Sequence, residues 1–163
     1  MRRGVGVSGR SGQVHTERGF DGLGSVWGRE SEGWELAVEP RRISAVLCSG
    51  DLGQSQAFYE QVVGLTLSAE TIPNHLLFEC GDGTTLLVYG RPAPSKADHT
   101  QVRFWTDDVE QDVRELESRG AVFEDYDFPA LKTVDHVATT PGLGKSAWFK
   151  DPDGNTLALF QPE

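Results

Sequence analysis

The stretch PGLGKSAWFKDPDGN, residues 141–155, holds two motifs that point to different folds. Its first part, GLGKS, is similar to the end of a phosphate-binding loop, and its last part, DPDGN, is typical of a tight turn. A phosphate-binding loop needs a glycine five residues before Gly144 and a helix after the lysine. Position 139 is Thr139, and KSAWFK reads as a strand rich in aromatic residues. We therefore predict a β-hairpin, with Pro152 presetting the turn between its strands.

Outward from this hairpin, one order of elements occurs twice along the chain. A short apolar strand over 43–49 precedes a helix over 51–64, and three strands follow. The order returns with a strand over 101–106, a helix over 107–120 and the strands that lead into the hairpin. This repetition predicts an α+β fold made of two βαβββ modules.

We predict one folded domain over 41–163, with module one over 42–91 and module two over 99–162. Residues 1–40 hold nine of the chain's nineteen glycines and show no apolar periodicity, so we predict a disordered extension. The GVGVSG motif over 4–9 matches a dinucleotide-binding fingerprint but lacks the strand before it and the helix after it.

The composition of the chain indicates which partners and which cellular compartment to expect. The formal net charge of −10 disfavours nucleic acid and anionic membranes. No apolar run approaches the ~18 residues of a membrane span, and the first residues lack the apolar segment of a secretory signal. A cytoplasmic protein is therefore expected, in which Cys48 and Cys80 are buried thiols rather than a disulfide.

Two motifs connect this pattern with a known family. AFYEQVVGL follows the first strand, and WFKDPDGNTLALFQP ends the chain. With these motifs in place, residues 42–162 resemble the vicinal oxygen chelate superfamily, which includes glyoxalase I, extradiol dioxygenases, fosfomycin-resistance enzymes and bleomycin-resistance proteins. The resemblance implies that the two modules form an open, eight-stranded, barrel-like sheet with helices outside. It also implies a divalent ion inside the barrel of metal-dependent members.

The resemblance places the four metal-binding positions of the family on Ser44, Leu87, Gln101 and Ala158. Leu87 and Ala158 cannot bind a metal, and a divalent site needs about three donors from histidines and carboxylates. We therefore expect no metal in the usual place and no cofactor. A displaced site that uses His99 and Glu79 stays open as an alternative.

Strand alternation predicts which side chains line the inner wall of the barrel. The predicted ligand-binding residues are Cys48, Tyr89, Gln101, Arg103, Trp105, Ser146, Trp148, Lys150 and Phe160. Their rings would supply apolar contact area, and Arg103 could pair with a carboxylate or phosphate. Equally, the aromatic side chains could fill a collapsed barrel, and Arg103 could pair with an acidic neighbour.

The favoured function is a metal-free protein that holds an aromatic or amphipathic small molecule in the barrel, as sequestering resistance proteins do. The alternatives are a glyoxalase-like lyase or isomerase or a dioxygenase with a displaced metal, an enzyme that uses Arg103 and the His136 loop without a metal, and a structural member that only dimerises. No catalytic residue is assigned, because Cys48 has no evident base. The long connection over 128–144 could close over a ligand and bring Asp135 and His136 with it. A homodimer is expected, and whether the modules pair within one chain or across the dimer stays open.

Overall fold

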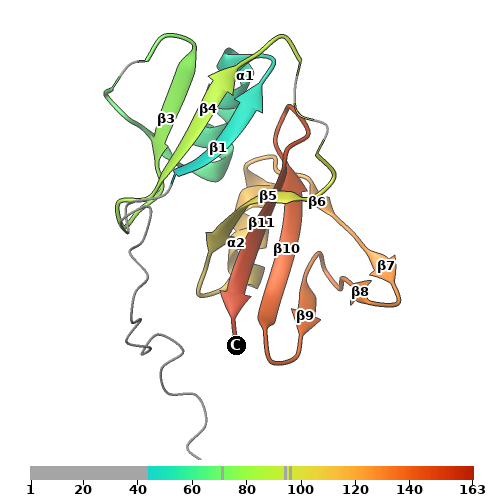
Figure 1. The fold of residues 1–163 in the computed structure, drawn as a ribbon. Helices are drawn as coiled ribbons and strands as arrows, with labels where there is room; N and C mark the ends of the chain where they lie inside the picture. Colours follow the sequence, from blue (N-terminus) through green and yellow to red (C-terminus); the bar gives the residue numbers. More distant parts are fainter. Residues whose placement is uncertain (1–43, 71, 94, 96) are drawn as a thin grey trace, which may run out of the picture. The chain divides into compact units, whose positions relative to one another are not determined.

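The computed structural model describes residues 44–70, 72–93, 95 and 97–163, which form the ribbon of Figure 1. The predicted disordered extension and its GVGVSG motif lie outside the described residues. Within the described part of the chain, no helix is both long and apolar enough to cross a membrane.

Module one has the predicted element order. Its elements are β1 (Ser44–Ser49), α1 (Leu52–Ala57), the π-helical continuation η1 (Phe58–Val63), β2 (Thr66–Leu67), β3 (His75–Glu79) and β4 (Thr85–Gly90). The strand order in the sheet is β1-β4-β3-β2, in which β1 runs parallel to β4 and the other pairs are antiparallel.

Capping chemistry sets both ends of the helical segment in module one. The Asp51 carboxylate accepts hydrogen bonds from the backbone N–H groups of Gly53 and Gln54, at 2.9 and 3.1 Å. At the other end Gly64 has a φ of 85°, a left-handed conformation that favours glycine. The helix predicted over 51–64 is therefore confirmed, with its second half widened into a π-helix.

Module two repeats the same order. Its sheet contains β5 (Thr100–Trp105), β6 (Phe123–Glu124), β10 (Gly144–Lys150) and β11 (Thr156–Pro162), with α2 (Val109–Ser118) between β5 and β6. The strand order is β5-β11-β10-β6, with β5 parallel to β11, and β9 (Ala138–Thr140) adds to part of β10. The segment between β6 and β9 forms a separate hairpin of β7 (Asp127–Phe128) and β8 (Leu131–Lys132), visible in Figure 1. We call residues 125–137, which include this hairpin, the arm.

The DPDGN segment is a turn between two strands, as predicted. Strands β10 and β11 pair antiparallel from Lys150 opposite Thr156, and Gly154 has a φ of 83°. The Asp151 carboxylate accepts hydrogen bonds from the backbone N–H groups of Asp153 and Asn155, at 3.0 and 2.8 Å. Because a strand follows GLGKS, no helix N-terminus is present there to bind a phosphate.

One helix covers one face of each sheet, and strand alternation places the apolar core on that face (Figure 1). The fully buried members of this core include Tyr59, Phe78, Leu86, Val88, Val109, Ala147, Phe149 and Leu157. We call the opposite face of each sheet its open face. The α+β class with mixed sheets is confirmed. The described strands form separate sheets for the two modules, so a single eight-stranded barrel-like sheet is not confirmed.

A buried polar junction connects the two modules through the DPDGN turn. The Tyr59 hydroxyl on η1 donates to Asp151 Oδ2 at 2.7 Å, and Asn155 Nδ2 donates to the same oxygen at 2.7 Å. Asn155 Nδ2 also donates to the Cys48 carbonyl oxygen, at 3.2 Å. Tyr59 and Asn155 are fully buried and Asp151 almost so, so each of these bonds replaces a lost contact with water. The FY and DPDGN motifs, far apart in sequence, are therefore contact partners.

Candidate functional site

The strand register places all the predicted ligand-binding residues except Gln101 on the open faces. A row crosses the module-two sheet from Arg103 on β5 through Ala158 on β11 and Trp148 on β10 to Glu124 on β6. Trp105, Phe160 and Ser146 form the next row, and Thr156 and Lys150 lie on the other side. The open face of module two is therefore aromatic and carries charges near its edges.

Arg103 lies beside two aromatic rings of this face. Its guanidinium carbon is 4.3 Å from the centre of the Phe160 ring and 5.0 Å from that of Trp105. The two rings meet edge to face at 5.2 Å. Phe160 is only 4% exposed, whereas Trp105 is 67% exposed. None of the ion pairs among the described residues involves Arg103, so the predicted alternative of an acidic neighbour is not observed there.

Trp148 forms one wall of a cavity at the other side of the row. Tyr126 meets its ring edge to face at 5.4 Å, and Trp148 Nε1 donates to Thr100 Oγ1 at 3.1 Å. A cavity of about 520 Å³ lies against these side chains, with His99 and Leu131 also in its lining. Its size falls within the range of small-molecule sites.

Glu124 organises the polar groups of this cavity. The Tyr126 hydroxyl donates to Glu124 Oε2 at 2.8 Å, and Lys150 Nζ lies 3.0 Å from Glu124 Oε1. Burial, together with the hydrogen bond to Glu124 and its negative charge, raises the pKa of Tyr126 to about 12. The phenol therefore remains a donor at neutral pH, and the charge of Lys150 is matched by a carboxylate.

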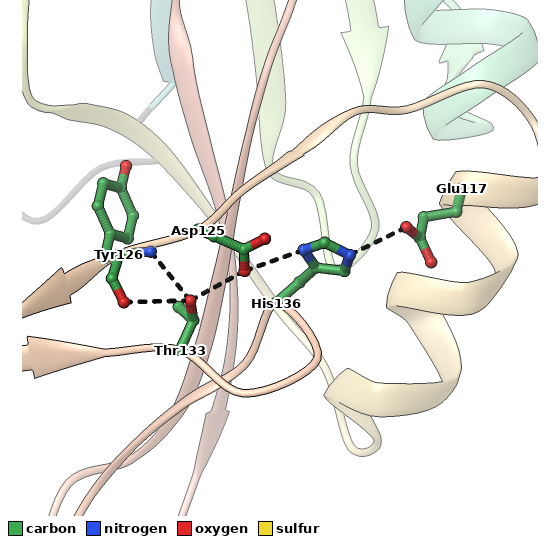
Figure 2. Close-up of polar contacts among 5 residues, drawn as sticks. All are labelled: Glu117, Asp125, Tyr126, Thr133 and His136. Atoms are coloured by element: carbon green, nitrogen blue, oxygen red, sulfur yellow. Dashed lines mark hydrogen bonds and ion pairs between the residues drawn. The ribbon is translucent and has the colours of Figure 1, made fainter.

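The arm that carries Tyr126 is fixed at its base by the polar contacts of Figure 2. Asp125 accepts a hydrogen bond from Thr133 Oγ1 at 2.9 Å and lies 3.2 Å from His136 Nδ1. His136 Nε2 lies 3.3 Å from the Glu117 carboxylate on α2. Thr133 Oγ1 also accepts the backbone N–H of Tyr126 at 2.9 Å. These contacts hold the start of the arm where Tyr126 can reach the cavity.

His136 itself lies away from the open face. Its ring packs 6.0 Å from that of Phe123, whose side chain belongs to the core on the helix side. His136 has a φ of 68° and Asp135 a φ of 49°, both in the left-handed region, so the pair forms the centre of a tight turn between Val134 and Val137. His136 therefore helps to fix the arm and does not line the cavity beside Trp148.

The open face of module one is smaller and more apolar. Val46, Leu87 and Leu77 are register partners across its centre, and Val46 is 55% exposed. Cys48 pairs in register with Tyr89 but is only 5% exposed, which leaves its thiol little surface for a ligand. Both cysteines are free thiols, as predicted, but only Cys48 is buried, whereas Cys80 is partly exposed.

The residues at the family's metal-binding positions do not fit a divalent ion. Ser44 and Thr85 bond to each other through their hydroxyls, and Leu87 and Ala158 offer no donor. His99 and Glu79, the pair for a displaced site, line different cavities. Among the residues the structure describes, no three histidine, cysteine or carboxylate side chains are grouped to hold an ion.

Gln101 is the one predicted ligand-binding residue that belongs elsewhere. The register between β5 and β11 shifts so that Thr100 pairs with Thr156 and Val102 with Leu157, which leaves Gln101 without a partner in the ladder. Its side-chain Nε2 donates to Asn155 Oδ1 at 3.0 Å. Gln101 therefore extends the buried polar junction, and Thr100 contacts Trp148 in its place.

Two residues that shape the cavity, Glu124 at the end of β6 and Tyr126 in the arm, are absent from the predicted ligand-binding residues. The signal was present in AVFEDYDF, because strand alternation from the buried Phe123 puts both residues on the opposite face. Assigning that face required the register of β6 with β10, which pairs Glu124 with Trp148.

The sequence and the fold both match a known superfamily of proteins. The sequence profile of the Glyoxalase/Bleomycin resistance protein/Dioxygenase superfamily matches residues 42–159, and the chain belongs to this superfamily. No protein of curated function matches the chain in sequence.

Solved structures of other superfamily members share the fold. TnmS3, an antibiotic binding protein from Streptomyces sp. CB03234, is 24% identical with a TM-score of 0.58, over 79% of this chain and 100% of that one. A lactoylglutathione lyase from Agrobacterium tumefaciens is 21% identical with a TM-score of 0.54, over 76% of this chain and 94% of that one. A glyoxalase/bleomycin resistance protein/dioxygenase from Nocardioides is 21% identical with a TM-score of 0.57, over 78% and 86%. At these identities the likeness concerns the fold alone.

Proposed function

We propose that the protein binds an aromatic or amphipathic small molecule on the open faces of its sheets and does so without a metal. The observation that carries this proposal is the cavity of about 520 Å³ beside Trp148. Its lining combines apolar ring surface with a few oriented polar groups, which is the usual composition of a small-molecule site. The likeness in fold to TnmS3, an antibiotic binding protein, supports the proposal.

The metal-free part of the proposal rests on the donor set. Two of the four family positions hold Leu87 and Ala158, and Gln101 is bonded to Asn155 instead of facing the cavity. The alternative is a lyase, isomerase or dioxygenase with a displaced ion. Elemental analysis of the purified protein separates the two, because one equivalent of zinc, nickel, manganese or iron per chain would overturn the metal-free proposal.

A homodimer is part of the same proposal. Val46 and Trp105 leave 55% and 67% of their surfaces exposed on the open faces, and a second copy packed there would remove this apolar surface from water. A second copy placed there would close the faces into the barrel-like hollow that the family fold implies. Light scattering should then give twice the 17.9 kDa mass of the chain. The cytoplasmic location likewise stays a prediction.

The binding proposal is tested with the neutral fluorescent probe N-phenyl-1-naphthylamine. We expect saturable binding that Trp148→Leu weakens about tenfold, since stacking on a tryptophan contributes on the order of 1 kcal/mol or more. Leu143→Ala is the matched control, because Leu143 is an exposed apolar residue (55%) that does not line the Trp148 cavity. Equal binding by the wild type and Trp148→Leu would refute this site.

A further inference from the structure

We propose that the ligand is an aromatic acid, whose ring system contacts Trp148 and whose anionic group is bound by Arg103. This inference rests on the proposed function and adds the charge and the dimensions of the ligand. It is carried by the environment of Arg103, which differs from that of Lys150, the other basic residue on the open face of module two.

Apart from Arg114, which is exposed on α2, the other lysines and arginines of module two have carboxylate partners. The pairs are Lys132 with Asp127, Lys145 with Glu110, Lys150 with Glu124 and Arg119 with Glu115. Arg103 is exposed and forms no ion pair with another described residue, although the chain carries a net charge of −10. The most positive point of the open face is therefore the guanidinium of Arg103.

The rings beneath Arg103 orient it for an anion. The guanidinium carbon lies 4.3 Å from the centre of the Phe160 ring and 5.0 Å from that of Trp105, and no ion pair with another described residue uses its N–H groups. A guanidinium stacked in this way presents a planar pair of donors that matches a carboxylate, sulfonate or phosphate. Such preorganisation lowers the conformational entropy lost on binding.

The strand register sets the length of the ligand. Ala158 pairs with Arg103 on one side and with Trp148 on the other, so the two side chains stand two strand spacings apart. That separation is roughly 10 Å between backbones, and Ala158 contributes only a methyl group between them. A fused two-ring or three-ring system with one acidic substituent can span this distance.

The Trp148 side of the face does not attract anions. Lys150, the nearest cation, is paired with Glu124, which also accepts the Tyr126 hydroxyl. Selection for a negative charge therefore depends on Arg103 alone, while the ring contact depends on Trp148. The two contributions can be separated by experiment.

The test uses the full chain and two probes with the same ring system, 8-anilino-1-naphthalenesulfonate and the neutral N-phenyl-1-naphthylamine. We expect the sulfonate to bind the wild type roughly 10- to 100-fold more tightly than the neutral probe, as for a charge-assisted hydrogen-bonded pair. Arg103→Gln should remove this difference and leave the affinity of the neutral probe within twofold. Arg103→Lys should keep part of it, and Arg114→Gln, an exposed position on α2, should keep all of it.

Each outcome distinguishes the two proposals. Equal binding of both probes to the wild type, or an equal loss of both in Arg103→Gln, would overturn the aromatic-acid inference and leave small-molecule binding intact. Binding of neither probe would overturn the proposed function and this inference with it. Circular dichroism of each variant confirms that the fold is retained before affinities are compared.

Discussion

Replacing Tyr59 with phenylalanine removes a single hydroxyl from the buried polar junction. Tyr59 is 0% exposed and donates to Asp151 Oδ2 at 2.7 Å, and Asp151 is 5% exposed. A hydrogen bond to a charged partner contributes about 1.5–3 kcal/mol. Asp151 retains its donors from Asn155 and Asp153 in the variant, so we expect a cost near 2 kcal/mol. For a domain of this size, that corresponds to a decrease in Tm of about 6–10 °C.

The matched control is Tyr126→Phe, which removes the same group from a partly exposed site. The Tyr126 hydroxyl also donates to a carboxylate, that of Glu124 at 2.8 Å, but water can replace it there. We expect a cost below about 1 kcal/mol. Urea unfolding followed by circular dichroism measures both variants. A cost for Tyr59→Phe no greater than that for Tyr126→Phe would show that burial at the junction does not govern its stability.

Three further predictions concern the helix end, the cavity tyrosine and the arm. Gly64→Ala should lower the free energy of unfolding by about 1–2 kcal/mol, because φ is 85° and the new Cβ would lie 2.9 Å from an Arg119 nitrogen. Gly53→Ala in α1 is the control and should be neutral or slightly stabilising. Equal effects of the two substitutions in urea titrations would contradict this prediction. With a folded pKa of about 12, Tyr126 contributes stability that is fully present below about pH 10 and is lost as the pH rises through 12. Unfolding measured at pH 9 and pH 12 should show a smaller loss in Tyr126→Phe than in the wild type, and an identical loss would refute the assignment. His136→Ala should release the arm from α2 and weaken binding of the neutral probe severalfold with little change in Tm, since its contacts with Glu117 and Asp125 are partly exposed. Unchanged affinity would show that the arm does not contribute to the site.

Local chemistry in the sequence was enough to predict the repeated fold. Asp51 and Gly64 marked the ends of a helix because side-chain capping and a positive φ depend on residues close in sequence. The DPDG turn was predictable for the same reason. Strand alternation then placed Arg103 and Trp148 on one face, and the observed register confirms that placement.

Features that depend on pairing between distant segments were not predictable. The shift in register at Gln101 depends on β5 and β11 together. Because of it, Thr100 contacts Trp148, and Gln101 bonds to Asn155 instead of lying on the open face. The contact of Tyr126 with Trp148 requires the path of the arm, which is fixed by Asp125 and His136. A glutamine or a tyrosine in a single sequence gives no sign of which distant residue it will contact.

Because Asp151 Oδ2 accepts hydrogen bonds from both modules, the chain should not divide into two independently stable halves. Tyr59 belongs to module one and Asn155 to module two, and both donate hydrogen bonds to Asp151 Oδ2. A fragment ending between the halves would expose a hydroxyl and a carboxylate that are otherwise enclosed, along with the ring surface around them. The two repeats, although alike in topology, should therefore melt as one cooperative unit, and separately expressed halves should gain structure only when mixed.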